Sequence, residues 1–357
     1  MKDFEPVVFL GEDGPLRTAL ERAGVRVEIV EISERTRNAS SKKIGLLQIA
    51  LGHGLDAVRY SLQLRRRIRA ENPTVIVSNT MKSHVFVCIS GIWKSVPYVA
   101  YIRDMITSEF MSGFGVRLIR SVLRLAPAGV IANSTATLAT VPAALRNRKS
   151  LVLPSPIQDP PTKASGSSNN RVCFALVGRI SPWKGQDLAI RALNEARKDV
   201  DCELRIIGGP LFGENEYESE LRALTKELGL NGFVEFRGHV DCVYDHLEDV
   251  DSVVHCSTIP EPFGQVVVQG MAMGLPVIAS GEGGPSEVII DGVTGLLFEP
   301  RSVEDLARKM TRLCRDPKLR FDLGSNALPA ASEYFSPVVT KRFEGFIASM
   351  VAGSASK

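Results

Sequence analysis

The stretch Val172-Cys-Phe-Ala-Leu-Val-Gly178-Arg179-Ile-Ser-Pro-Trp-Lys184-Gly185 decides the fold of this chain. Its six leading apolar residues predict a buried strand, which Gly178 ends, and a helix is expected directly after the loop. The loop carries two cations, Arg179 and Lys184. A strand, a short cationic loop and a helix N-terminus together form an arrangement that binds a diphosphate at the edge of a parallel sheet. Two solvated cations on an ordinary loop are the alternative interpretation.

Two further loops repeat this arrangement. In Glu261-Pro-Phe-Gly-Gln-Val-Val-Val-Gln269, Gly-Gln opens a helix whose first backbone N–H groups point back at the turn. Gln265 and Gln269 are one helical turn apart and share a face. The glycine-rich run Gly281-Glu-Gly-Gly-Pro-Ser-Glu287 follows a predicted strand at 276–280 and lets the backbone approach a ligand closely. Ligands of open parallel sheets bind at the carboxyl ends of the strands, where all three loops are predicted to lie.

Strand and helix patterns alternate along the whole chain, which is typical of α/β domains with parallel, doubly wound sheets. Strands are expected near 7–10, 25–30, 75–77, 97–102, 130–132 and 151–153, and helices near 15–23, 46–70 and 83–93. A second series runs from 172 to about 323. The pattern predicts an N-terminal domain at 1–160, a Pro/Ser/Asn-rich linker at 161–170, a C-terminal domain at 171–335 and a last helix at 336–352.

Composition agrees with two globular domains. The 357 residues are 44% hydrophobic, and the chain has neither an expected signal peptide nor an apolar run of membrane-spanning length. Its six cysteines are dispersed without a CxxC pair, which favours reduced thiols in a cytoplasmic protein. The histidines lack metal-ligand spacing, so no metal or other cofactor is expected. The Asp249-Val-Asp251 motif is interpreted as structural because it lies between a predicted helix and a predicted strand.

Charge is unevenly distributed. Residues 1–160 carry 22 Lys and Arg against 13 Asp and Glu, whereas the remainder carries 21 against 27. A basic N-terminal half suggests an anionic partner, such as a phosphorylated acceptor or a lipid surface. Nucleic acid is not expected, because no recognised motif or aromatic interleaving accompanies the charge.

The segment 109–125 is a candidate for contact with the inner face of an anionic membrane. Arg117, Arg120 and Arg124 fall on one side of a predicted helix, mostly opposite its aliphatic residues. An ordinary domain helix with a solvated arginine face is the alternative.

The ordered motifs resemble those of retaining glycosyltransferases of family 4 (glycosyl transferases group 1). The matching runs are Val177-Gly-Arg-Ile-Ser-Pro-Trp-Lys-Gly185, Ile206-Ile-Gly-Gly209, Phe236-Arg-Gly-His-Val240, Glu261-Pro-Phe-Gly264, Gly274-Leu-Pro-Val-Ile-Ala279, Gly283-Gly-Pro-Ser-Glu287 and Asp291-Gly-Val-Thr-Gly-Leu-Leu297. The resemblance is dense from 171 to about 316 and weak before that. It implies the GT-B fold, with two Rossmann-like domains facing a cleft and a last helix that returns to the first domain.

The resemblance also implies roles for individual residues. Arg179 and Lys184 would hold the diphosphate of a nucleotide-sugar donor, and Glu261 would face the donor sugar. The resemblance implies that these three are the catalytic residues. The remaining donor-side residues are Gly11, Gly14, Gly178, Gly209, Gly238, His239, Val240, Phe263, Gly264, Gln265 and Gln269. The acceptor side would include Arg103, Asp104 and Asn133.

Two departures from the family pattern affect the expected function. Relatives usually have Glu at position 269, where it binds both ribose hydroxyls, and many have His near Arg103. We expect transfer of a sugar, with retention, to an acceptor in cell-envelope glycan, polysaccharide or glycolipid synthesis. The alternatives are a non-catalytic nucleotide-sugar-binding protein, a natural-product glycosyltransferase and a nucleotide-sugar epimerase, the last disfavoured by the Glu-Pro-Phe-Gly motif.

Overall fold

The computed structural model describes residues 4–34, 54–161, 164–165, 171–211 and 213–355. The chain divides into two compact units. We call residues 1–154 with 340–357 the N-terminal domain, and residues 155–339 the C-terminal domain. Part of the predicted helix at 46–70 and most of the predicted linker at 161–170 lie outside the described residues.

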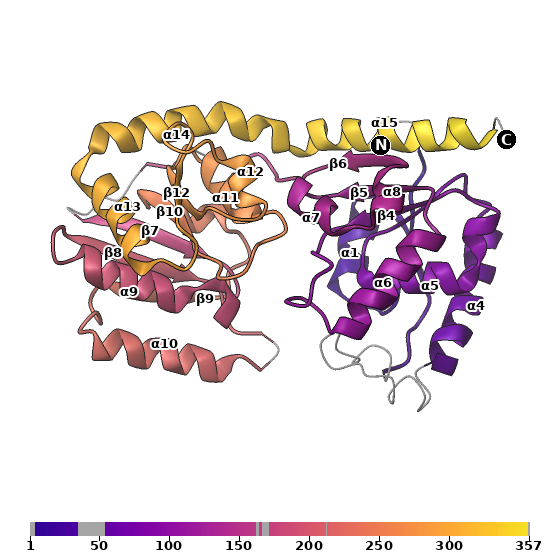
Figure 1. Ribbon diagram of the computed structural model, residues 1–357, viewed down its shortest axis with the longest axis horizontal. Coiled ribbons are helices and arrows are strands. Elements are labelled where there is room, and N and C mark those ends of the chain that lie inside the picture. The colour runs from indigo at the N-terminus through magenta and orange to yellow at the C-terminus, as the bar shows by residue number, and fades with distance from the viewer. Residues whose placement is uncertain (1–3, 35–53, 162–163, 166–170, 212, 356–357) are drawn as a thin grey trace. The chain divides into compact units, whose positions relative to one another are not determined.

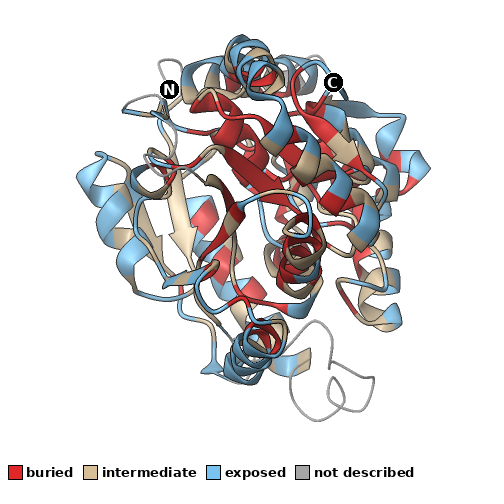
Figure 2. Ribbon diagram, turned by 90° about the vertical axis from the view of Figure 1, so that its left-hand side faces the viewer, coloured by how far each residue is buried: buried red, intermediate tan, exposed pale blue. Residues whose placement is uncertain are grey.

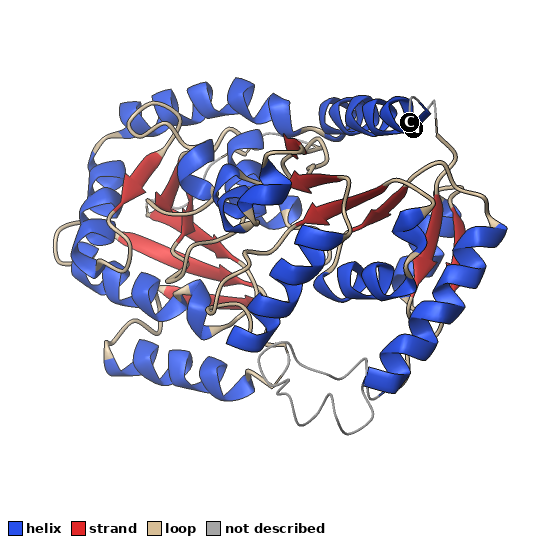
Figure 3. Ribbon diagram, turned by 45° about the vertical axis from the view of Figure 1, so that its right-hand side comes forward, coloured by secondary structure: helices blue, strands red, loops and turns tan. Residues whose placement is uncertain are grey.

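The C-terminal domain alternates strands and helices along the chain (Figures 1 and 3). Its elements are β7 (Val172–Val177), η3 (Pro182–Lys184), α9 (Gln186–Ala196), β8 (Cys202–Ile207), α10 (Asn215–Glu227), β9 (Val234–Gly238), η4 (Tyr244–His246), β10 (Ser252–His255), α11 (Gln265–Ala272), β11 (Val277–Ser280), α12 (Pro285–Val288), β12 (Leu296–Phe298), α13 (Val303–Arg315), α14 (Pro317–Ala331) and η5 (Ser332–Tyr334). The predicted strand at 172–177 and the helix starts at 186 and 265 are confirmed.

The strand order of the C-terminal sheet is β12-β11-β10-β7-β8-β9, and all its ladders are parallel. The chain starts in the middle at β7, runs outward through β8 and β9, and then returns to the other side at β10. The strand order therefore reverses between β7 and β10. At such a switch point the two following loops diverge to opposite faces and leave a crevice at the carboxyl edge, where ligands of this architecture bind.

Each face of this sheet is buried under helices, as the red strands of Figure 2 show. Alternate residues of β7 supply the two cores, because successive side chains of a strand point to opposite faces. Phe174 and Leu176 pack with residues of α9 and α13, whereas Cys173 and Ala175 pack with residues of α11 and α14. The sheet is thus packed on both sides, and the loops at its edge start from buried strands.

The N-terminal domain repeats the alternation with shorter strands. Its elements are β1 (Val7–Leu10), α1 (Pro15–Arg22), β2 (Arg26–Ile29), α4 (Gly54–Ala70), β3 (Ile76–Ser78), α5 (Met81–Ser90), η2 (Ile92–Lys94), β4 (Tyr98–Ile102), α6 (Gly113–Leu125), β5 (Gly129–Ala132), α7 (Thr135–Thr140), α8 (Ala143–Arg146) and β6 (Lys149–Val152). Ladders join β3-β4-β5-β6 in one parallel sheet and β1-β2 in another. A single continuous sheet is not formed within the described residues. Val30 instead shares an apolar core with residues of β3, β4 and β5, and Phe9 packs against that core.

The helix α15 (Ser336–Ala355) starts in the C-terminal domain and its later residues belong to the N-terminal domain. Within the N-terminal domain, Lys149 Nζ donates to the carbonyl of Ser349 at 2.6 Å, and Arg342 donates to the carbonyl of Val152 at 2.8 Å. Lys149 and Val152 are the first and last residues of β6. The last helix therefore lies against the edge strand of the four-stranded sheet.

The apolar face of α6 is used inside its own domain. Ile119 and Leu123 are part of the N-terminal core, and Val122 is also buried, whereas Arg117 and Arg124 are exposed. Packing against the core therefore accounts for the amphipathic pattern of this helix, in agreement with the domain-helix interpretation. Among the described residues, no helix combines the length and the apolar character needed to cross a membrane.

The contact between α14 and the turn after α11 gives a test of the packing. A Cβ atom at Gly324 would lie 2.0 Å from the carbonyl oxygen of Gly274. We expect Gly324→Ala to destabilise the protein by about 2 kcal/mol, because two backbones would have to separate. Thermal and urea unfolding should show this loss.

A matched control is Gly345→Ala in α15, where an added Cβ meets no atom within 4 Å. That change should be neutral or stabilising by up to about 1 kcal/mol, since alanine favours helix. Equal unfolding midpoints for both variants would contradict the close α14 contact.

Candidate functional site

A buried ion pair lies at the switch point of the C-terminal sheet. Lys184 comes from the loop after β7 and Glu261 from the loop after β10, the two strands that flank the reversal. Lys184 Nζ is 2.8 Å from both carboxylate oxygens of Glu261, and the two side chains are 15% and 12% exposed. The ammonium group also lies 4.3 Å from the centre of the Trp183 ring. The structure thus brings together two of the three residues predicted to be catalytic.

The backbone around Lys184 fits closely against the strand β10 end. Gly185 has φ of +72°, and a Cβ there would lie 2.1 Å from the carbonyl oxygen of Cys256. The amide of Thr258 donates to the carbonyl of Trp183 at 2.8 Å. Only glycine satisfies both the left-handed conformation and the contact at position 185, so the Lys-Gly pair holds the cation at this place.

The turn that carries Glu261 is fitted equally closely to the loop after β11. The amide of Gly284 donates to the carbonyl of Glu261 at 2.8 Å, and a Cβ at Gly283 would meet the backbone of Glu261 at 2.5 Å. Gly264, with φ of +81°, then redirects the chain into α11. Gly283 and Gly284 belong to the run that was predicted to let a ligand approach closely. In the structure they let the Glu261 backbone approach closely.

The predicted residues that follow Glu261 differ in exposure. Phe263 is buried in the core beside Tyr334, with ring centroids 5.8 Å apart. Gln265 is exposed at the first position of α11, and Gln269 is half-buried one turn further. The helix N-terminus thus follows the Glu261 turn directly in the chain, and the first backbone amides of an α-helix have no partner within the helix.

Glu261 is held as a carboxylate. Burial by itself raises its pKa, but the electrostatic interactions with His255 and Lys184 and their hydrogen bonds outweigh burial. The net effect holds the pKa of Glu261 well below its ordinary value of 4.5. The carboxylate is therefore an ionised acceptor at every physiological pH.

Two residues that sequence analysis missed bind the same carboxylate. His255 Nε2 and Ser257 Oγ each lie 2.6 Å from Glu261 Oε2. Both precede Glu261 by fewer than seven residues, at the end of β10 and in its loop. A histidine and a serine at the carboxyl end of a predicted strand, next to a candidate carboxylate, were the available signal.

Arg179, the third predicted catalytic residue, is paired with a carboxylate from the loop after β8. Its Nε lies 3.6 Å from Glu214 Oε2, and Ser181 Oγ donates to Glu214 Oε1 at 2.6 Å. The carbonyl of Arg179 accepts from Gln186 Nε2 at 2.9 Å. Sequence analysis did not identify Glu214, because it lies 35 positions from Arg179 and the β7–β8 pairing brings the two loops together.

The loops after β7, β8 and β9 contact one another. The amide of Gly178 donates to the carbonyl of Ile207 at 2.9 Å, and that of Ile180 donates to the carbonyl of Gly209 at 3.0 Å. Gly238 has φ of +71° and its carbonyl accepts from the amide of Gly208. These glycines form a continuous backbone surface at the strand ends. The two residues that follow, His239 and Val240, are exposed and half-buried.

The remaining predicted residues belong to the N-terminal domain. Gly11 and Gly14 flank the loop between β1 and α1, and a Cβ at Gly11 would lie 2.4 Å from Ile32 Cδ1. Arg103 and Asp104 are exposed after β4. Asn133 is buried after β5, where its Nδ2 donates to the carbonyl of Arg103 at 3.0 Å. Asn133 therefore ties the ends of β4 and β5 together and fixes the backbone of Arg103.

Both aspartates of the Asp249-Val-Asp251 motif form contacts within the C-terminal domain. Asp249 Oδ1 pairs with Arg205 NH1 at 2.6 Å, and Asp251 Oδ2 accepts from the amide of Cys173 at 2.8 Å. Within the described parts of the chain, no group of three or more His, Cys, Asp or Glu side chains is arranged to hold a metal ion. These contacts agree with the structural interpretation of the motif.

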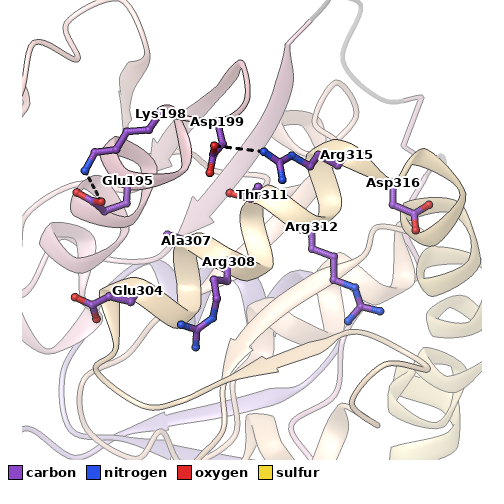
Figure 4. Close-up of a pocket in the computed structure, with 10 residues that line it drawn as sticks. All are labelled: Glu195, Lys198, Asp199, Glu304, Ala307, Arg308, Thr311, Arg312, Arg315 and Asp316. Atoms are coloured by element: carbon purple, nitrogen blue, oxygen red, sulfur yellow. Dashed lines mark hydrogen bonds and ion pairs between the residues drawn. The ribbon is translucent and has the colours of Figure 1, made fainter.

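An open cleft of about 670 Å³ lies elsewhere in the C-terminal domain, between α9 and α13 (Figure 4). Its charged lining is balanced, with four cations and four carboxylates. Asp199 pairs with Arg315, and Glu195 pairs with Lys198. None of the residues predicted from sequence lines it. The ion pair at the switch point, rather than this cleft, is the candidate site.

Known structures place the fold in a class. The chain matches the Anabaena protein HepE in complex with UDP with a TM-score of 0.79 at 26% identity, over 96% of this chain and 92% of that one. It also matches sucrose-phosphate synthase from Thermosynechococcus elongatus with a TM-score of 0.72 at 18% identity, over 97% and 96% of the two chains. The fold is GT-B, the class of two Rossmann-like domains.

A family match lies in the C-terminal domain. Residues 160–328, somewhat less than half of the chain, match the family model described as glycosyl transferases group 1. A D-inositol 3-phosphate glycosyltransferase from Kribbella flavida is 32% identical over 180 residues, which are 48% of this chain and 42% of the relative. A lipopolysaccharide 1,2-N-acetylglucosaminetransferase from Salmonella typhimurium is 33% identical over 174 residues, 47% and 45% of the two chains. The similarity thus spans less than half of these relatives.

The lowered pKa of Glu261 predicts a pH dependence of stability. Because the folded pKa lies below 4.5, the stabilisation is fully present above that value and is lost as pH falls toward the folded pKa. Glu261→Gln leaves Lys184 without its carboxylate, which should cost about 3 kcal/mol near neutral pH. The difference from the wild type in urea unfolding should shrink below about pH 4.5.

The exposed Glu299→Gln variant serves as the control and should unfold as the wild type does throughout this range. A penalty for Glu261→Gln that stays constant, or grows, down to low pH would show that the carboxylate is not held ionised in the folded protein.

Proposed function

We propose that this protein is a retaining family 4 glycosyltransferase that moves a sugar from a nucleoside-diphosphate sugar to an acceptor. The observation that carries the proposal is the Lys184–Glu261 pair at the switch point, with Arg179 on the adjoining loop. The arrangement supports the proposal, because cations would neutralise a leaving diphosphate and a fixed carboxylate beside them would accept hydrogen bonds from sugar hydroxyls.

The donor would be held by the C-terminal domain. Arg179, Lys184 and the first turn of α11 supply positive charge and amides for the diphosphate. The loop Gly238-His-Val240 would line the nucleobase, and Gln269 the ribose. A uridine nucleotide is the first candidate, because the relative HepE was crystallised with UDP-glucose and matches most of this chain.

Retention is inferred from the resemblance to family 4 rather than from a catalytic dyad. In such enzymes the donor phosphate is taken to assist deprotonation of the acceptor on the face where the sugar bond breaks. This chain's contribution would be to bind the diphosphate through Arg179 and Lys184 and to orient the sugar through Glu261. No general base and no metal is required of the protein in this proposal.

The acceptor is proposed to be a cell-envelope glycan, a polysaccharide or a glycolipid. The names of the Kribbella and Salmonella relatives, an inositol-phosphate and a lipopolysaccharide glycosyltransferase, support a phosphorylated or lipid-linked acceptor. The exposed Arg103 and the basic composition of residues 1–160 fit an anionic group. Contact with an anionic membrane at the cytoplasmic face would rest on charge, since the apolar face of α6 is buried.

A non-catalytic nucleotide-sugar-binding protein is the second candidate. The observation in its favour is Gln269, which offers the ribose one acceptor oxygen where a carboxylate would offer two. Substituting Glu261 by Ala separates the two functions. Transfer should collapse in an enzyme, whereas a binding module would lose only part of its affinity.

Nucleotide binding tests the proposal first. Thermal unfolding should be followed with UDP, GDP, ADP and dTDP added separately, because a ligand that binds only the folded state stabilises it by about 2.7 kcal/mol at one hundred times its Kd. We expect one nucleotide to raise the melting temperature, and this rise to be lost in Arg179→Ala. Inorganic phosphate is the control ligand. If none of the four nucleotides shifts the wild type, the proposal fails.

Position 269 gives a second test. Gln269→Glu should tighten nucleotide binding about fivefold in calorimetry, since it restores one hydrogen bond to the ribose. Gln63→Glu, an exposed change of the same charge in α4, should leave affinity unchanged. Weaker binding by Gln269→Glu would show that this helix face does not meet the ribose.

A further inference from the structure

The carboxylate of Glu261 has an unequal set of partners on its two oxygens. Oε2 accepts from Ser257 Oγ at 2.6 Å, from His255 Nε2 at 2.6 Å and from Lys184 Nζ at 2.8 Å. Oε1 accepts from Lys184 Nζ at 2.8 Å. A carboxylate oxygen has room for about two strong donors, so Oε2 is fully used and Oε1 keeps an acceptor position.

The donors on Oε2 are rigid. His255 is the last residue of β10 and is 4% exposed, and Ser257 is 2% exposed. His255 is fixed by its place in the buried strand, whose neighbours β7 and β11 are paired on both sides. The backbone of Glu261 is held independently by Gly283 and Gly284. The side chain is therefore restrained from its backbone and from its Oε2 atom at the same time.

The hydrogen-bond pattern assigns the tautomer of His255. Nε2 faces a carboxylate oxygen, which can only accept, so Nε2 carries the proton. Nδ1 is buried and has no hydrogen-bond partner among the described residues. A histidine whose second nitrogen is unused is costly to bury. The cost is understandable if the Nε2–H bond to Glu261 has a function.

We propose that His255 is a positioning residue, which holds Glu261 by Oε2 so that Oε1 is the oxygen presented to a hydroxyl of the donor sugar. The inference rests on the proposed function, and it adds a residue and an atom to it. In this proposal the Lys184 ammonium group interacts with two anionic groups, the Glu261 carboxylate and the diphosphate. When the diphosphate binds Lys184 and weakens its bonds to Glu261, the hydrogen bonds from His255 and Ser257 keep the Glu261 side chain in place.

The proposal predicts an effect on sugar recognition and little effect on diphosphate recognition. The measurement is calorimetric binding of UDP and of UDP-glucose to the same preparation, which gives the ratio of the two Kd values. In His255→Leu, we expect UDP to bind as in the wild type and the UDP-glucose affinity to fall about tenfold, the size of one charge-assisted hydrogen bond.

His255→Gln provides the conservative variant, because its amide NH₂ can replace the Nε2 donor, and it should restore most of the sugar contribution. His246→Gln in η4 is the matched control and should bind both ligands normally. Folding of each variant is checked by its unfolding midpoint. A long-range ¹H–¹⁵N NMR correlation spectrum should show a proton on Nε2 of His255, and this signal should change in Glu261→Gln.

The outcomes separate this inference from the proposed function. If the wild type binds neither UDP nor UDP-glucose, the uridine donor assignment and the inference both fail. If the wild type binds both and folded His255→Leu keeps the same ratio of Kd values, the inference alone is overturned. A His255→Leu variant that loses UDP and UDP-glucose equally also overturns it, since a general disturbance of the site, rather than positioning of Glu261, would explain that result.

Discussion

The structure of the candidate site depends on one constraint, the contact between the loops that follow β7 and β10. These loops diverge to opposite sides of the sheet, yet Gly185 lies so close to the Cys256 carbonyl that no side chain fits between them. The contact brings Lys184 to Glu261 and sets the distance between a cation and a carboxylate that lie 77 positions apart. Trp183 and His255 contact this pair directly, and Gly284 donates to the backbone of Glu261.

The pair also explains how two charged side chains can be mostly buried at the switch point. A lysine and a glutamate that are both mostly buried would each be costly alone. Together, and with Ser257 and His255 on the second oxygen, they satisfy one another. Arg179 and Glu214 repeat the same solution on the neighbouring loops. Under the proposed function, these cations would be in place before the diphosphate, and binding would exchange one anionic partner for another.

Most of the C-terminal domain could be predicted from its sequence, because the apolar run at 172–177, the glycines that follow each strand and the helix starts at 186 and 265 are local signals. The candidate site residues Lys184 and Glu261 were found by the same signals. Glu214 was not, since its partner is fixed by strand pairing. His255 was not, although its place at the carboxyl end of a predicted strand close to Glu261 was a signal. In the N-terminal domain, the sequence predicted where the strands lie. It did not predict that β2 and β3 are joined by side-chain packing and not by a ladder of backbone hydrogen bonds.

The helix α15 has a consequence for the order in which the protein is completed during synthesis. The N-terminal domain takes its last structural element from residues 340–357, whereas the C-terminal domain is contained in residues 155–339. Domains generally fold as units while the chain emerges. Here the second domain in sequence has all its parts first, and the first domain must wait, with the edge strand β6 uncovered, until α15 has been synthesised.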